Sequence, residues 1–205
     1  MNTVLLFIVW AAGFGAFFPV SAAVCRRPCG VRALGGFLAI LCFYKSRSLP
    51  ECLTLFAFLE MLTMTACVDA KTMEIPDCLN GALFLIGAVS VITVPGLSVF
   101  DRVVGIASVS VPLLLLALAV PGSFGGGDIK LMGACGLFLG WKRSLIALFL
   151  AVLTGGACGV WLLFTGRKGR KDHFAFGPFL CLGMFLALFW SEELLSAYLR
   201  LCGLY

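Results

Sequence analysis

Charge is scarce in this sequence, and so is histidine. Of the 205 residues 12% are charged, His173 is the only histidine, and no long polar insert separates the apolar runs. The shortage of charge excludes an ordinary soluble domain, and 61% hydrophobic residues with a mean hydropathy of +1.09 are typical of polytopic membrane proteins. A lone histidine without a Ser or Cys partner weakens nucleophile–base chemistry. We predict an all-α membrane bundle that forms one domain over residues 1–205.

Cysteine is abundant, but paired cysteine motifs are lacking. Five of the ten cysteines fall inside or at the ends of apolar runs, where a thiol behaves as a small hydrophobic group: Cys42, Cys67, Cys135, Cys158 and Cys181. The exception is Cys25 with Cys29, which supplies only half of a tetrahedral zinc site. We therefore expect no metal and no cofactor.

Six apolar stretches are long enough to cross a bilayer, at roughly 20 residues per spanning helix. They are residues 4–24, 52–68, 78–94, 103–121, 144–164 and 174–190. Two shorter stretches, 33–44 and 129–141, are either helices in a locally thinned membrane or re-entrant pieces. The sequence predicts six to eight membrane segments, with the first of them retained as an anchor.

The net charge of +5 comes from basic residues in short loops, which set membrane orientation, and we expect no binding of nucleic acid. If all eight stretches cross, residues 69–77 and 122–128 share the more basic side with the loop 167–171. That side is then predicted to be cytoplasmic, and we expect lipids to surround the protein. Because two crossings separate Asp69 from Asp128, both carboxylates are predicted to face the same side.

Two polar stretches, 69–77 and 125–130, set carboxylates at the edges of apolar segments. An ionisable group is costly there, so a functional explanation is the default hypothesis. Asp77 is different, because it directly follows Pro76 and precedes an apolar run. That position predicts a helix N-cap rather than a catalytic group.

Asp69 and Asp128 are predicted at opposite kinds of helix end. Asp69 ends an apolar helix, where the macrodipole disfavours a negative charge, whereas Asp128 begins one, close to Lys130, where the dipole favours the carboxylate. Such a difference suits a general acid and a general base: one carboxyl holds a proton while the other takes one from a water that attacks a carbonyl. This is aspartic-protease chemistry, with Asp128 as the hypothetical base and Asp69 as the acid.

Glycines surround the second carboxylate. Gly125, Gly126 and Gly127 let the backbone approach an extended peptide and allow positive φ, although a glycine-rich turn between membrane helices is also common. Small residues recur after Asp128, at Gly133, Gly136 and Gly140. Their spacing predicts close helix packing, which would help to hold Asp128 against the segment that bears Asp69.

Glu60 is a further carboxylate inside an apolar stretch. It lies nine residues before Asp69, about two and a half helical turns, so the two side chains are predicted on opposite faces. A different class of function stays open, a small transporter or channel in which Asp69, Asp128 and Glu60 bind cations or relay protons. The absence of a visible internal repeat argues against it, and a non-catalytic scaffold would not need both aspartates.

Three elements in order carry a family resemblance. Asp69 followed by Ile75-Pro76-Asp77, then Gly125-x-Gly127-Asp128-x-Lys130, then Phe176-Gly177-Pro178-Phe179 resemble the type IV prepilin peptidases, intramembrane aspartyl proteases of the Gly-x-Gly-Asp class. The resemblance covers roughly residues 33–190. It implies that Asp69 and Asp128 are catalytic and that the neighbouring Pro76, Lys130, Gly177 and Pro178, with the three glycines, shape the site. It also implies cleavage of leaders from prepilin or pseudopilin precursors, after a glycine, at the cytoplasmic face.

The chain departs from the family pattern near its beginning. Many such peptidases carry two Cys-x-x-Cys pairs that bind zinc and also N-methylate the product with S-adenosylmethionine. Residues 25–32 are too short for that region, and only Cys25 and Cys29 stand there. We therefore expect peptidase activity without methyltransferase activity.

Overall fold

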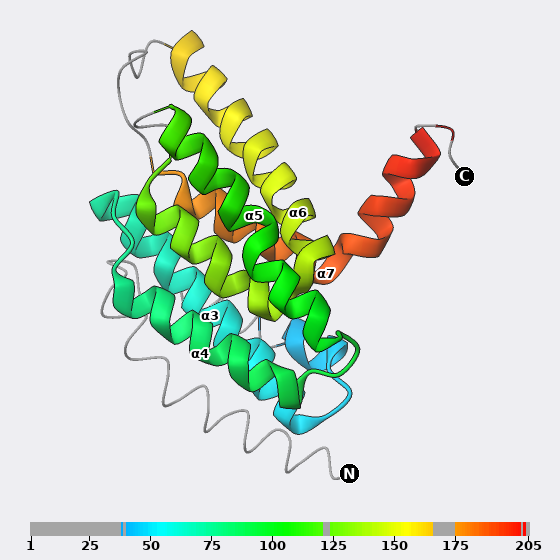
Figure 1. The fold of residues 1–205 in the computed structure, drawn as a ribbon. Coiled ribbons are helices and arrows are strands. Elements are labelled where there is room, and N and C mark those ends of the chain that lie inside the picture. The colour runs from blue at the N-terminus through cyan, green and yellow to red at the C-terminus, as the bar shows by residue number, and fades with distance from the viewer. Residues whose placement is uncertain (1–37, 39, 121–123, 166–174, 202, 204–205) are drawn as a thin grey trace.

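The computed structural model describes residues 38, 40–120, 124–165, 175–201 and 203. Five helices, α3 to α7, make up nearly all of this part, and none of its residues lies in a strand (Figure 1). The predicted first membrane segment, 4–24, lies outside the described residues. The all-α prediction is confirmed, and the full number of membrane segments stays a prediction.

Helix α3 spans Leu49–Thr72 and carries the first candidate carboxylate in its last turn. Ser48 caps its beginning, because the Ser48 hydroxyl accepts the Glu51 N–H at 3.4 Å. The helix ends at Met73, whose left-handed backbone (φ 55°) turns its N–H onto the carbonyl of Asp69 at 2.8 Å. Asp69 is thus fixed at a helix C-terminus, as predicted.

Helices α4 (Asp77–Thr93) and α5 (Val99–Ala119) follow as two further rods. They are joined at the end remote from Asp69 by Arg102, which is completely buried. Its guanidinium donates to the Val94 carbonyl at 2.7 Å and to the Ser90 hydroxyl at 2.6 Å, both near the end of α4. It also donates to the Leu137 carbonyl of α6 at 3.2 Å. One arginine side chain therefore connects the helices α4, α5 and α6.

Helix α6 spans Gly126–Phe164 and is broken at Gly140 (φ 75°, ψ 169°). The predicted segments 129–141 and 144–164 are its two halves, which lie at a steep angle to each other in Figure 1. A backbone conformation of this kind is open almost only to glycine. The break allows one continuous stretch of chain to run in two directions.

The glycines of the first half of α6 pack against α5. A Cβ on Gly136 would overlap the backbone carbonyl of Gly105, and one on Gly133 would lie 3.5 Å from the Ser110 hydroxyl. Close helix packing is therefore confirmed, but its partner differs from the prediction. These glycines join α6 to α5 and do not press Asp128 toward α3.

Helix α7 spans Gly177–Leu201 and departs from helical geometry at Trp190. Its first part packs in the bundle, and its last part projects away from it (Figure 1). The packed part lies against the second half of α6, where a Cβ on Gly183 would overlap the Ala147 carbonyl. Phe58 of α3 and Phe138 of α6 stack with ring centroids 3.9 Å apart in the core between these helices.

Helices α3, α5, α6 and α7 are each long and apolar enough to cross a membrane, and α4 is a shorter apolar helix of 17 residues. Large apolar side chains cover the outside of the bundle, among them Ile92, Leu115 and Leu118, with exposed fractions of 90%, 61% and 72%. An exposed apolar surface of this kind marks contact with a membrane or with another protein, and the length and hydropathy of the four helices favour the membrane. The protein is a multi-pass membrane protein.

Candidate active site

Two carboxylates from distant parts of the chain line one cavity. Asp69, in the last turn of α3, and Asp128, in the first turn of α6, both contact a cavity of about 260 Å³. Its other lining residues come from the α3–α4 connection and from the turn before α6: Met73, Glu74, Ile75, Gly125, Gly126 and Gly127. The structure therefore brings together the two aspartates that the sequence placed on one side.

Asp69 is held by the beginning of α7. Its side chain is only 4% exposed, and its Oδ2 accepts the backbone N–H of Gly177 at 2.8 Å. Gly177 is the first residue of α7, so this N–H has no partner within its own helix. The positive end of α7 thus meets the carboxyl that lies at the negative end of α3.

This contact requires a glycine. A Cβ on Gly177 would lie 2.5 Å from Oδ2 of Asp69 and 2.8 Å from its Cγ, closer than real Cβ atoms approach. The resemblance marked Gly177 as a site-shaping residue, but the sequence did not reveal its hydrogen bond. The Gly177 N–H favours the ionised form of Asp69, whereas the dipole of α3 disfavours it. The assignment of Asp69 as acid and Asp128 as base therefore stays a hypothesis.

Asp128 is positioned by the glycine turn. Its N–H donates to the Gly125 carbonyl at 3.1 Å, and a Cβ on Gly125 would lie 3.3 Å from the Asp128 carboxylate. A Cβ on Gly127 would lie 3.1 Å from that of Ile75, whereas one on Gly126 would meet open space. Two of the three glycines, Gly125 and Gly127, therefore lie where an added Cβ would be in tight contact with a neighbour.

The glycines of this turn do not use their freedom to adopt positive φ. The glycines of positive φ in the described part of the chain are Gly96, Gly140 and Gly203. The turn at residues 125–127 leads directly into α6, which begins at Gly126, so right-handed backbone already suits it.

Asp77 does not cap α4, which corrects another prediction. The N-cap of α4 is Pro76, no side chain caps the helix, and Asp77 is its first residue. Both Asp77 carboxylate oxygens instead accept hydrogen bonds from Lys130 Nζ, at 2.7 and 2.9 Å. This exposed ion pair ties the beginning of α4 to that of α6, so Lys130 pairs with Asp77.

Two prolines border the site without donating to it. The Pro76 carbonyl accepts the N–H of Leu79 at 3.0 Å and so opens α4 directly after Ile75, which packs on Gly127. Pro178 follows Gly177 in the first turn of α7, where the missing N–H costs nothing. Pro76 therefore fixes the chain direction next to the cavity-lining Ile75, and Pro178 fixes it next to Gly177, whose N–H holds Asp69.

Other candidate residues lie elsewhere. Glu60 is buried in α3 but does not line the cavity of the two aspartates. The described residues contain no group of three or more His, Cys, Asp or Glu side chains that could hold a metal ion. The cysteine pair Cys25 and Cys29, the loop 167–171 and His173 lie outside the described residues.

The fold and the cavity define a class, that of polytopic helical membrane proteins in which a buried and a half-buried aspartate, each at a helix end, line one cavity. The sequence model of the Type IV leader peptidase family matches residues 55–160, a range that contains both Asp69 and Asp128. The chain belongs to this family.

Curated relatives carry the name prepilin leader peptidase/N-methyltransferase. The protein from Bacillus subtilis (strain 168) is 29% identical over 144 residues, which cover 70% of this chain and 58% of that protein. The one from Legionella pneumophila is 30% identical over 71% of this chain and 53% of its own length. The one from Pectobacterium carotovorum is 32% identical over 72% and 54%. The chain spans about half the length of these relatives, and no solved structure matches it.

Proposed function

We propose that this protein is an aspartic endopeptidase that removes the leader from type IV prepilin-like precursors. The observation that carries the proposal is the shared cavity of Asp69 and Asp128, one carboxyl of which is held by the Gly177 N–H. Family membership and the relatives' names supply the substrate class. The N-methyltransferase half of those names is not part of the proposal.

The chemistry needs a water between the two carboxyls. Asp128, as carboxylate, takes a proton from the water, whose oxygen attacks the scissile carbonyl, while the protonated Asp69 gives its proton to the carbonyl oxygen. Asp128 then gives its proton to the leaving amine as the C–N bond breaks, and Asp69 takes a proton back from one hydroxyl of the tetrahedral intermediate as the new C=O bond forms. The pair ends with one proton, as it began, so no cofactor is consumed. Since the two carboxyls titrate together, the assignment of roles belongs to this scheme and not to separate acid constants.

The setting of the reaction is also proposed. The cavity lies at the ends of apolar helices, where a cut near the membrane surface is possible. We propose the bacterial inner membrane, a site that faces the cytoplasm, and cleavage after a glycine of the leader. A substrate that itself enters the membrane follows from this location.

Co-expression with a prepilin tests the proposal, with leader removal measured by mass. Asp69→Asn and Asp128→Asn should each abolish cleavage, because each removes one of the two proton-transfer groups. Asp77→Asn is the matched control, since Asp77 pairs with Lys130 outside the cavity. Cleavage by all three variants would refute the catalytic assignment.

A pH–rate profile adds a second test. A dyad that needs one protonated and one ionised carboxyl gives a bell-shaped kcat/KM profile. A profile with a single limb would contradict the paired mechanism.

A further inference from the structure

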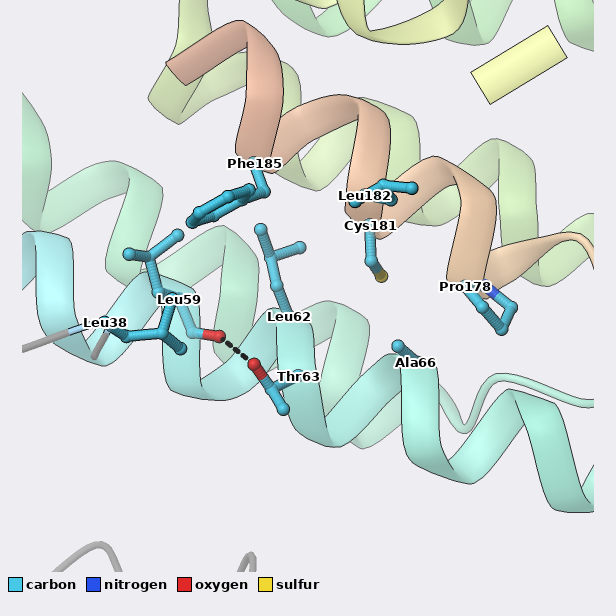
Figure 2. A pocket seen from close by; sticks show the side chains of 9 residues that line it. All are labelled: Leu38, Leu59, Leu62, Thr63, Ala66, Pro178, Cys181, Leu182 and Phe185. Carbon is cyan, nitrogen blue, oxygen red and sulfur yellow. Dashed lines mark hydrogen bonds between the residues drawn. The ribbon is translucent and has the colours of Figure 1, made fainter. Parts of the chain in front are cut away.

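A second cavity of about 260 Å³ lies between α3 and α7, and its walls are apolar (Figure 2). Figure 2 shows side chains of α3 facing side chains of α7 across it. The α3 wall consists of Leu59, Leu62, Thr63 and Ala66; the α7 wall consists of Pro178, Cys181, Leu182 and Phe185; and Leu38 lies at one end. We call this space the α3–α7 groove.

The groove offers almost no polar partner. The Thr63 hydroxyl already donates to the Leu59 carbonyl of its own helix at 2.9 Å, as drawn in Figure 2. The Cys181 thiol points toward α3 and is a weak donor. Water would find few hydrogen-bond partners in such a space, so an apolar occupant is favoured.

The groove adjoins the catalytic contact. Ala66 lies three residues before Asp69 on α3, one helical turn away, and Pro178 directly follows Gly177 on α7. The same two helices that join at Asp69 and Gly177 therefore continue as the groove walls. From Asp69 to Leu59 the wall extends about 15 Å, at 1.5 Å per residue.

The place of the groove beside the Asp69–Gly177 contact points to its occupant. A polypeptide cut between Asp69 and Asp128 must leave the cavity on both sides of the scissile bond. Beside the Asp69–Gly177 contact, the described residues that line the groove are mostly apolar. A helix can cross this region because it satisfies its own backbone groups. The groove is slightly smaller than pockets for drug-sized ligands, which have about 300–1,000 Å³, so it holds a few side chains rather than a whole helix.

We infer that the α3–α7 groove receives large apolar side chains of the substrate segment on one side of the scissile bond. The inference rests on the proposed function and deepens it, since it assigns the apolar recognition of the substrate to named positions. Thr63, Leu62 and Cys181 would set which side chains fit. A lipid chain in the groove is the competing outcome.

Filling the groove tests the inference. Thr63→Phe places a ring in the space, and Thr154→Phe is the matched control, because Thr154 is also half-buried in a helix and donates to the carbonyl four residues earlier, at 2.8 Å. Two substrates are compared, a precursor with an apolar segment beside its junction and a short soluble peptide that spans the junction alone. Thr63→Phe should raise the ratio of KM for the precursor to KM for the peptide about tenfold, and Thr154→Phe should not.

The two possible failures are distinguishable. If the wild type cuts neither substrate, the proposed function is refuted and the inference with it. If the wild type cuts both and Thr63→Phe gives the same KM ratio as Thr154→Phe, the inference alone is refuted.

Photo-crosslinking of the wild type gives a result that does not depend on the folding of a variant. A diazirine-bearing leucine is placed in the apolar segment of the precursor, and the adduct is located by mass spectrometry. Adducts on residues 59–66 of α3 or 178–185 of α7 support the inference. Adducts confined to other helices, with a diazirine-bearing phospholipid labelling the groove instead, overturn it.

Discussion

Replacing Gly177 with alanine perturbs the candidate site through a single methyl group. The added Cβ would lie 2.5 Å from Oδ2 of Asp69, 2.8 Å from Cγ and 3.0 Å from Cβ. Rotation of the methyl group does not relieve the clash, because the backbone fixes the position of the Cβ atom. Either the Asp69 carboxyl or the beginning of α7 must move.

The size of the effect follows from the contact that is lost. A hydrogen bond to a charged group contributes about 1.5–3 kcal/mol, and each 1.36 kcal/mol corresponds to a tenfold change in rate. If the carboxyl is misplaced in the transition state by the loss of this bond, kcat should fall about ten- to a hundredfold. A shift of about 1 Å in a catalytic group can itself cost about a hundredfold.

Leader cleavage by purified protein in detergent measures kcat, and thermal unfolding in the same detergent measures stability. Gly81→Ala is the control, because a Cβ at this helical position meets nothing within 4 Å. That substitution should keep activity and raise stability slightly, as Gly to Ala does in a helix. Wild-type kcat in Gly177→Ala, or an equal loss in Gly81→Ala, would refute the reasoning.

Three further substitutions test other contacts. Lys130→Ala removes an exposed ion pair with Asp77, so urea unfolding should show a loss of at most about 1 kcal/mol; a larger loss would mean that Lys130 has another role. Gly136→Ala forces a Cβ against the Gly105 carbonyl and should lower the free energy of unfolding by about 1–3 kcal/mol, and an unchanged value would contradict the close approach of α5 and α6. Gly140→Ala puts a Cβ on a backbone with φ of 75° and should cost about 1–3 kcal/mol, with lower thermal stability as the readout; full stability would exclude a break at that residue.

The apolar stretches were sufficient to predict the helices that the structure describes. Residues 52–68, 78–94 and 103–121 lie in or close to α3, α4 and α5, because long apolar runs leave little choice other than helix in a membrane. Counting two crossings between Asp69 and Asp128 was enough to place them at the same end. These inferences use only the length and hydropathy of the apolar stretches and the even number of crossings between the two aspartates.

Contacts between distant helices could not be predicted in this way. The bond from Gly177 to Asp69 joins residues 108 positions apart, and its formation depends on how α7 packs on α3. The Lys130–Asp77 pair was missed for a similar reason, since a residue after proline suggests a cap until another helix offers a cation. Arg102 lies between the predicted stretches 78–94 and 103–121, and the sequence alone does not show that packing buries it against carbonyl groups near the end of α4 and in α6. The spacing of apolar residues along the sequence does not determine the angles at which helices cross, and these angles decide all three contacts.

The break in α6 connects these observations. Its first half carries Asp128 and packs on α5, while its second half supports α7, with Gly155 against Phe176 and Phe179. Since α7 in turn supplies the N–H that holds Asp69, both aspartates are positioned through one helix that changes direction at Gly140. Damage to that break should therefore move the two carboxyls relative to each other, even though Gly140 lies 12 residues from the nearer one. If Gly140→Ala loses more cleavage activity than the decrease in its folded fraction explains, the coupling is supported. If the folded fraction of the variant cleaves at the wild-type rate, the coupling is refuted.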